Sequence, residues 1–134
     1  MAGLSNPFGF GLVFQPAEAN SLSATFTGNP CYEGYSGMLH GGVISALIDT
    51  VMANWLLRND IIAVTGELTV RYLRPIASNA TLTVTTWIDA SLPPLYHLKA
   101  TIRLGKTIVC KGKAKFMQQE PIGARHAEPE NSRR

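Results

Sequence analysis

One segment of this 134-residue chain has the sequence pattern of a helix with almost no polar, solvent-exposed face. From Gly42 to Arg58 good helix formers predominate, apolar residues occupy nearly every face, and Asn59-Asp60 ends the run. A helix that is apolar nearly all round is normally buried by other elements. We therefore expect the remainder of the chain to wrap around this helix.

The remainder of the chain is dominated by alternating apolar and polar residues, which is the period of a β-strand. Strands are expected at residues 11–16, 21–27, 61–76, 80–91, 95–105 and 107–119, and a glycine-rich loop at 28–39. This order predicts an α+β protein in which a curved antiparallel sheet of about six strands wraps one central helix. Such a sheet leaves its far face and its edges open, so self-association is expected.

The length and composition fit one domain, expected at residues 1–120, followed by a disordered tail at 121–134. No apolar stretch is long enough to span a bilayer, and the first residues lack the pattern of a signal peptide. Cys31 and Cys110 have no metal-ligand spacing, so we expect no metal and two buried or idle thiols in a reducing cytoplasm.

The net charge is +3 and the pI is near 9.1, but the basic residues are scattered, so no nucleic-acid partner is expected. Lys111, Lys113 and Lys115 are a local exception, because their alternation puts them on one face of a strand. A solvated strand face is the favoured interpretation of this stripe, ahead of a phosphate-binding role.

Two features of the helical segment indicate chemistry. His40-Gly41-Gly42 precedes it, and glycines there leave the first helical N–H groups unobstructed, so that they can hold a developing oxyanion. Asp49 is the only formally charged residue between Glu33 and Arg58. A carboxylate in an apolar setting has a raised proton affinity, which suits a general base or a nucleophile. The alternatives are a tight loop-to-helix joint plugged by His40, and an Asp49 that only fixes the helix by hydrogen bonds from Ser45, Thr50 or Asn54.

These residues carry a resemblance to the acyl-CoA thioesterases of the hotdog fold, in the small branch that includes the phenylacetate-pathway enzymes and human thioesterase superfamily members. The stretches are "NPFGFGL" at 6–12, "EGYSGMLHGGVISALIDT" at 33–50 and "AVTGELTVRYLRPI" at 63–76. The resemblance covers most of the chain. The acid nine residues after the histidine, followed by the Y-x-R-P strand, makes it fairly specific.

The resemblance implies an enzyme that hydrolyses an acyl-CoA to a free acid and coenzyme A, with coenzyme A as part of the substrate and no other cofactor. In that enzyme the Gly41 N–H polarises the thioester carbonyl, Asp49 is general base or nucleophile, and Thr65 positions the water. His40 also belongs to the implied catalytic set. The implied substrate-binding residues are Leu39, Gly42, Gly66 and, for the phosphates, Arg74 ahead of Arg71, Arg103 and the lysines.

One departure from the resemblance concerns Gly34, which stands where some relatives have Asn or Gln. Glu33 and Tyr35 are the available substitutes for that polar contact. A second question concerns Thr65, because simple alternation puts it on the face opposite Val64 and Leu68. Either a bulge at Gly66 turns it toward the helix, or it serves at the strand's end, or it is an ordinary strand residue.

A length argument makes a partner chain necessary. Gly41 and Asp49 are eight residues apart, which is about 12 Å along a helix. An oxyanion donor and a base must each come within roughly 3 Å of the reacting atoms, so one helix cannot supply both. Two antiparallel helices from two protomers can, which predicts a homodimer or a dimer of dimers. The rival functions are a hotdog hydratase or dehydratase and a non-catalytic acyl-CoA binding module.

Overall fold

The computed structural model describes residues 10–34 and 37–120 and contains the predicted helix and six strands. The expected tail at 121–134 and Tyr35 lie outside the described residues. The elements are β1 (Val13–Ala17), β2 (Ser21–Thr27), the short 3-10 helix η1 (Pro30–Tyr32), α2 (Gly41–Arg58), β3 (Ala63–Tyr72), β4 (Thr81–Leu92), β5 (Leu95–Leu104) and β6 (Thr107–Gln118).

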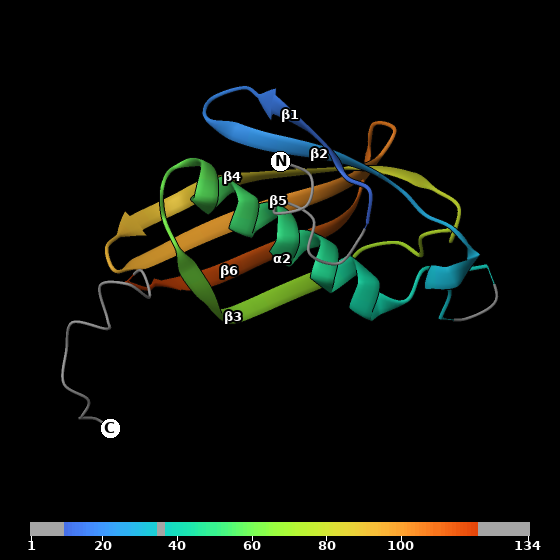
Figure 1. Cartoon of the computed structure of the whole chain (residues 1–134). Coiled ribbons are helices and arrows are strands. Elements are labelled where there is room, and N and C mark those ends of the chain that lie inside the picture. Colours follow the sequence, from blue (N-terminus) through green and yellow to red (C-terminus); the bar gives the residue numbers. More distant parts are fainter. Residues whose placement is uncertain (1–9, 35–36, 121–134) are drawn as a thin grey trace.

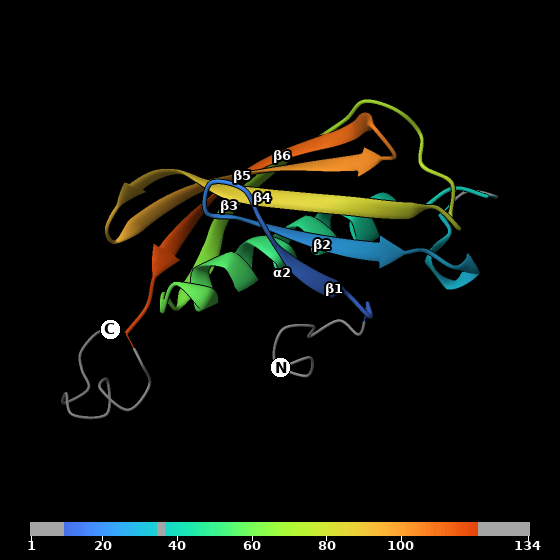
Figure 2. The same ribbon diagram turned by 90° about the horizontal axis from the view of Figure 1, so that it is seen from above.

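The strands form one antiparallel sheet in the order β1-β2-β4-β5-β6-β3. The sheet curves, and α2 lies across one of its faces (Figure 1). Seen from above, the whole helix is on the same side of the strands, and the opposite face carries no helix of the described chain (Figure 2). No helix in the described part of the chain combines the length and apolarity that a membrane crossing requires.

The core lies between α2 and the concave face of the sheet. Apolar side chains of the helix such as Leu47, Ile48 and Val51 are fully buried against inward-facing residues of the strands. Gly112 of β6 lets the helix come close, since a Cβ there would lie 3.1 Å from the Ile48 Cγ2. The same strands turn their alternate residues outward, as the period of two requires.

The expectation of a fully buried helix is wrong for one stripe of α2. Gly41 and Gly42 are exposed, and Ser45, Ala46 and Asp49 are only half-buried. These positions recur at three- and four-residue intervals, so they share one face of the helix. The reason is geometric, because a sheet that packs on one side of a helix cannot cover its other side.

The loop that leads into α2 is tied down by backbone hydrogen bonds. The His40 N–H donates to the Tyr32 carbonyl at 2.7 Å, and the Leu39 N–H donates to the Ile76 carbonyl at 2.9 Å. The Tyr32 ring packs against Phe26 and, edge to face, against Phe10. The start of the helix is therefore fixed to η1 and to the segment between β3 and β4, which orients its first N–H groups.

Candidate active site

The helix begins at Gly41, one residue earlier than the sequence pattern predicts, because His40 acts as its N-cap. The His40 Nδ1 accepts a hydrogen bond from the Gly42 N–H at 2.8 Å. The N–H groups of Val43 and Ile44 donate to the His40 carbonyl. Of the four amides in the first turn, only the Gly41 N–H has no acceptor among the described residues, so it is the amide available to a ligand.

Tyr72, at the end of β3, fastens the helix start to the sheet. Its Oη donates to the Gly41 carbonyl at 2.9 Å and lies 3.1 Å from the Ser45 Oγ. Alternation along β3 puts Tyr72 on the same face of the strand as Leu68 and Val70. The hydrogen bonds depend on the helix crossing this strand at its end, and no sequence pattern states that crossing.

Asp49 lies two turns further along the same stripe of α2. Its Oδ1 accepts a hydrogen bond from the Thr65 Oγ1 at 2.6 Å, and no described cation forms an ion pair with it. The suggestion that Ser45 or Thr50 supports the carboxylate is wrong, since Ser45 bonds Tyr72 and Thr50 Oγ1 donates to the Ala46 carbonyl. The supporting donor comes from the sheet instead of the helix.

A β-bulge turns Thr65 toward Asp49. In the β3–β6 ladder Glu67 is opposite Lys115 and Thr65 is opposite Phe116, so Gly66 is an extra residue. The extra residue shifts the alternation by one and moves Thr65 to the helix side of the strand. A Cβ at Gly66 would lie at an ordinary 3.5 Å from the Lys115 carbonyl oxygen. The additional residue, and not the missing side chain, therefore sets the geometry.

A hollow of about 250 Å³ adjoins the helix start. Leu39, Gly41, Tyr72 and Arg74 line it together with neighbouring apolar residues. The structure thus brings three predicted residues, Leu39, Gly41 and Arg74, to one place. Asp49 and Thr65 form a separate pair that does not line this hollow.

The other candidate residues are placed elsewhere. Arg71, Lys111 and Lys113 line a groove on the far face of the sheet, away from Arg74. The Glu33 carboxylate accepts a hydrogen bond from the Ser78 Oγ at 2.9 Å. Among the described residues no three His, Cys, Asp or Glu side chains gather in a way that could hold a metal ion.

Comparisons with known proteins agree with this architecture. Residues 36–90 match the model of the thioesterase superfamily, and this segment contains the helix start, Asp49 and Thr65. The match covers less than half of the chain, whose curved antiparallel sheet around one helix is the hotdog fold. The roles of its individual residues stay predictions.

Three solved structures show the same fold. The E. coli PaaI protein from the phenylacetic acid degradation operon is 20% identical, with a TM-score of 0.74 over 83% of this chain and 81% of that one. A hypothetical thioesterase from Streptococcus pneumoniae, solved with coenzyme A, is 16% identical, with a TM-score of 0.79 over 87% and 92%. A thioesterase superfamily protein is 24% identical, with a TM-score of 0.73 over 79% of this chain, which spans 55% of that protein's length.

Proposed function

We propose that this hotdog protein hydrolyses acyl-CoA thioesters, and that each of its active sites is shared by two copies of the chain. The observation that carries the proposal is the half-buried Asp49 carboxylate, held by Thr65 at 2.6 Å on a helix face that the chain's own sheet leaves uncovered. The coenzyme A in the S. pneumoniae structure supports the choice of substrate class.

The reaction needs one base and one oxyanion donor. Asp49 takes a proton from water, whose oxygen bonds to the thioester carbon while the carbonyl oxygen becomes an anion. The Gly41 N–H at the positive end of a helix stabilises that anion. The C–S bond then breaks, the sulfur of coenzyme A receives the proton, and the acid is released. The carboxylate can alternatively attack the carbon itself and break the C–S bond to form an anhydride. The coenzyme A thiolate leaves and takes up a proton, and water then opens the anhydride to release the acid and restore the carboxylate.

The second copy is proposed to dock along β3. This strand is at the edge of the sheet, and one of its sides has no strand partner among the described residues. Val64 and Tyr72 expose 52% and 48% of their surface there, and an open apolar edge is a template for another strand. Antiparallel pairing of two β3 strands extends both sheets into one.

Such a pairing brings the two halves of the site together. Tyr72 attaches the Gly41 end of α2 to one end of β3, and Thr65 attaches Asp49 to the other end. In an antiparallel pair related by a two-fold axis, the Tyr72 end of one strand lies beside the Thr65 end of the other. Each Asp49 then faces the Gly41 end of the second copy, and the dimer has two sites.

Arg74 is proposed as a contact for the coenzyme A phosphates, since it lines the hollow beside Gly41 and its guanidinium is suited to phosphate oxygens. A hydratase is less well supported. It usually pairs a histidine with an acid, and the hydrogen bond that Asp49 accepts comes from Thr65 and not from a histidine.

The test is release of free thiol from a panel of aromatic and straight-chain acyl-CoAs. Asp49→Asn keeps the shape of the side chain and removes the base, so we expect hydrolysis to fall at least about 100-fold. Asp60→Asn, in the exposed turn just after the same helix, is the matched control and should act like the wild type. Absence of thiol release from every substrate would contradict the proposal and direct attention to crotonyl-CoA hydration and to binding alone.

A further inference from the structure

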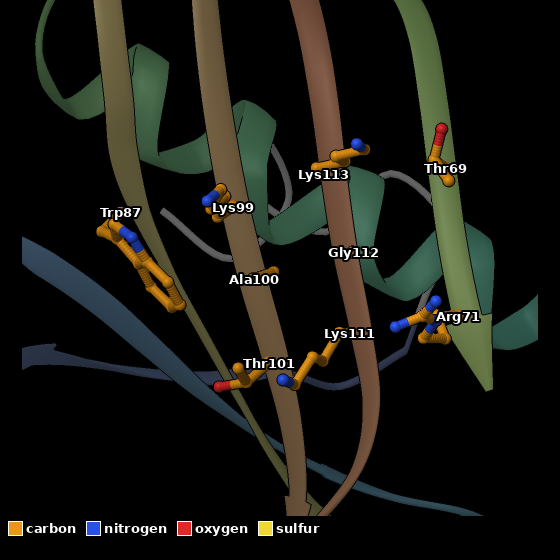
Figure 3. A pocket seen from close by; sticks show the side chains of 9 residues that line it. All are labelled: Thr69, Arg71, Trp87, Lys99, Ala100, Thr101, Lys111, Gly112 and Lys113. Carbon is orange, nitrogen blue, oxygen red and sulfur yellow. The ribbon is translucent and has the colours of Figure 1, made fainter. Parts of the chain in front are cut away.

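A groove of about 480 Å³ crosses the far face of the sheet and is lined from four strands. Figure 3 shows Trp87 of β4 at one side of it and Arg71 of β3 at the other, with Lys99, Lys111 and Lys113 between them and α2 behind the strands. The sheet separates this groove from the helix side, where Asp49 and Gly41 lie.

Three of the four cations that line the groove have no ion-pair partner within the described chain. The strand register puts Lys99 directly opposite Lys113, and Arg71 directly opposite Lys111. Like charges in directly opposed positions destabilise a sheet. The described ion pairs here are Lys99–Asp89 at 3.8 Å and Lys115–Glu67 at 3.6 Å, and both are solvent-exposed.

Arg71, Lys111 and Lys113 form no ion pair with any described residue, so their field points into the groove. The acidic residues Glu67 and Asp89 line an adjoining hollow, whereas the charged residues that line the groove itself are all cations. The arrangement is unfavourable for the empty fold, and an anion in the groove would relieve it.

The remaining lining indicates what kind of anion fits. Trp87 is half-buried at the wall of the groove, next to Lys99 in the ladder, and an indole ring offers a stacking surface to a base. Three strand spacings, about 14 Å in all, separate the Trp87 strand from the Arg71 strand. The span suits a base at one end and a chain of phosphates at the other. Arg71 adds a planar guanidinium that can bind phosphate with two hydrogen bonds.

We propose that this groove is a second ligand site, which binds a free nucleoside polyphosphate with its base on Trp87 and its phosphates on Arg71, Lys111 and Lys113. A second copy stacked on the same face is a poor occupant, because it would oppose the same cations to one another. The site shares no residue with the proposed thioesterase site, so either proposal can fail without the other.

The experiment is a calorimetric titration of the full chain with ATP, followed in parallel by tryptophan fluorescence. We expect saturable binding at one site per chain, weakened by added salt, and quenching of Trp87. Trp55, the other tryptophan, is a buried residue of α2 whose Nε1 donates to the Asn20 carbonyl, so it should not respond. Trp87→Leu should therefore abolish the quenching and weaken ATP binding by about tenfold. The affinity for inorganic triphosphate should stay unchanged.

The double variant Lys111→Gln/Lys113→Gln should weaken ATP binding by at least about tenfold, since each lysine removed takes away a charged contact. Lys106→Gln, in the exposed β5–β6 turn, is the matched control and should bind ATP like the wild type.

Absence of saturable ATP binding at millimolar concentration would overturn the proposal. So would an affinity that does not respond to the double variant. If inorganic triphosphate binds as tightly as ATP, the groove is only a counter-ion site, and the proposal that it recognises a nucleotide is contradicted. A loss of ATP binding in Arg74→Gln would move the nucleotide to the helix side and equally contradict the groove.

Discussion

The two faces of the sheet carry different chemistry on the same strands. On β3, Thr65 and Tyr72 face the helix and are held by hydrogen bonds of 2.6 and 2.9 Å to Asp49 and Gly41. Between them, Thr69 and Arg71 face outward into a cationic groove where no described partner holds the arginine. One face depends on a few fixed contacts and the other on charge density. A substitution on one face should therefore leave the function of the other unchanged.

The largest contrast is expected between thiols, because Cys110 points inward beside the outward-facing Lys111, and Cys31 is exposed. Burial raises the pKa of the Cys110 thiol to about 11, against an ordinary value of 9.0. At pH 8 its thiolate fraction is therefore about 100-fold below that of an ordinary thiol, and the thiolate is the reactive form.

Iodoacetamide at pH 8 should label Cys31, and the labelling rate of Cys110 should be at least about 100-fold lower. Peptide mass spectrometry measures both rates. The Cys110 rate should rise as the pH approaches 11. Cys31→Ser should remove the fast reaction. Equal rates at the two cysteines would show that the inner side of β6 is open to solvent.

A second contrast uses two threonines of β3 on opposite faces. Thr65→Val removes the hydroxyl that donates to Asp49 with little change in volume, so we expect kcat for thioester hydrolysis to fall about tenfold or more. Thr65→Ser keeps the hydroxyl, so it should retain most of the wild-type kcat. Thr69→Val, the matched control on the far face, should hydrolyse like the wild type, and a loss of activity there equal to that of Thr65→Val would end the distinction between the faces.

The smallest effect is on stability. Lys111→Gln/Lys113→Gln removes two directly opposed like-charge pairs, so the free energy of unfolding should rise by about 0.5–1 kcal/mol at low salt. The gain should shrink at high salt, which screens exposed charges. Urea unfolding at low and high salt measures the gain and its salt dependence. Lys115 pairs with Glu67, so Lys115→Gln is the control and should not raise the free energy of unfolding. A stability loss in the double variant would mean that the lysines support the sheet.

The architecture was predictable because burial imposes periods on a sequence, 3.6 residues for α2 and two for the strands. The position of Thr65 was not, since alternation leaves open where a strand takes in an extra residue, and only the β3–β6 register locates it at Gly66. Likewise, the sequence grouped Arg74 with Arg71 as phosphate contacts. The structure separates them, because the chain leaves β3 between the two residues and Arg74 turns toward the helix start.

Mixing two inactive variants shows whether two copies of the chain share each active site. Gly41→Pro removes only the proposed oxyanion donor, because proline is well tolerated at the first helical position and His40, with φ −66° and ψ 134°, already has the conformation required before proline. Gly41→Ala keeps the N–H and adds a Cβ 3.4 Å from the Tyr72 Oη, so it is the matched control. The second inactive variant is Asp49→Asn.

After subunit exchange of equal amounts, half of the dimers should be mixed, and each mixed dimer should have one intact site. A quarter of all sites are then intact, so we expect recovery of about a quarter of the wild-type hydrolysis rate. If exchange is demonstrated by native mass spectrometry and no activity returns, Asp49 and Gly41 do not act across two copies, and the claim is contradicted.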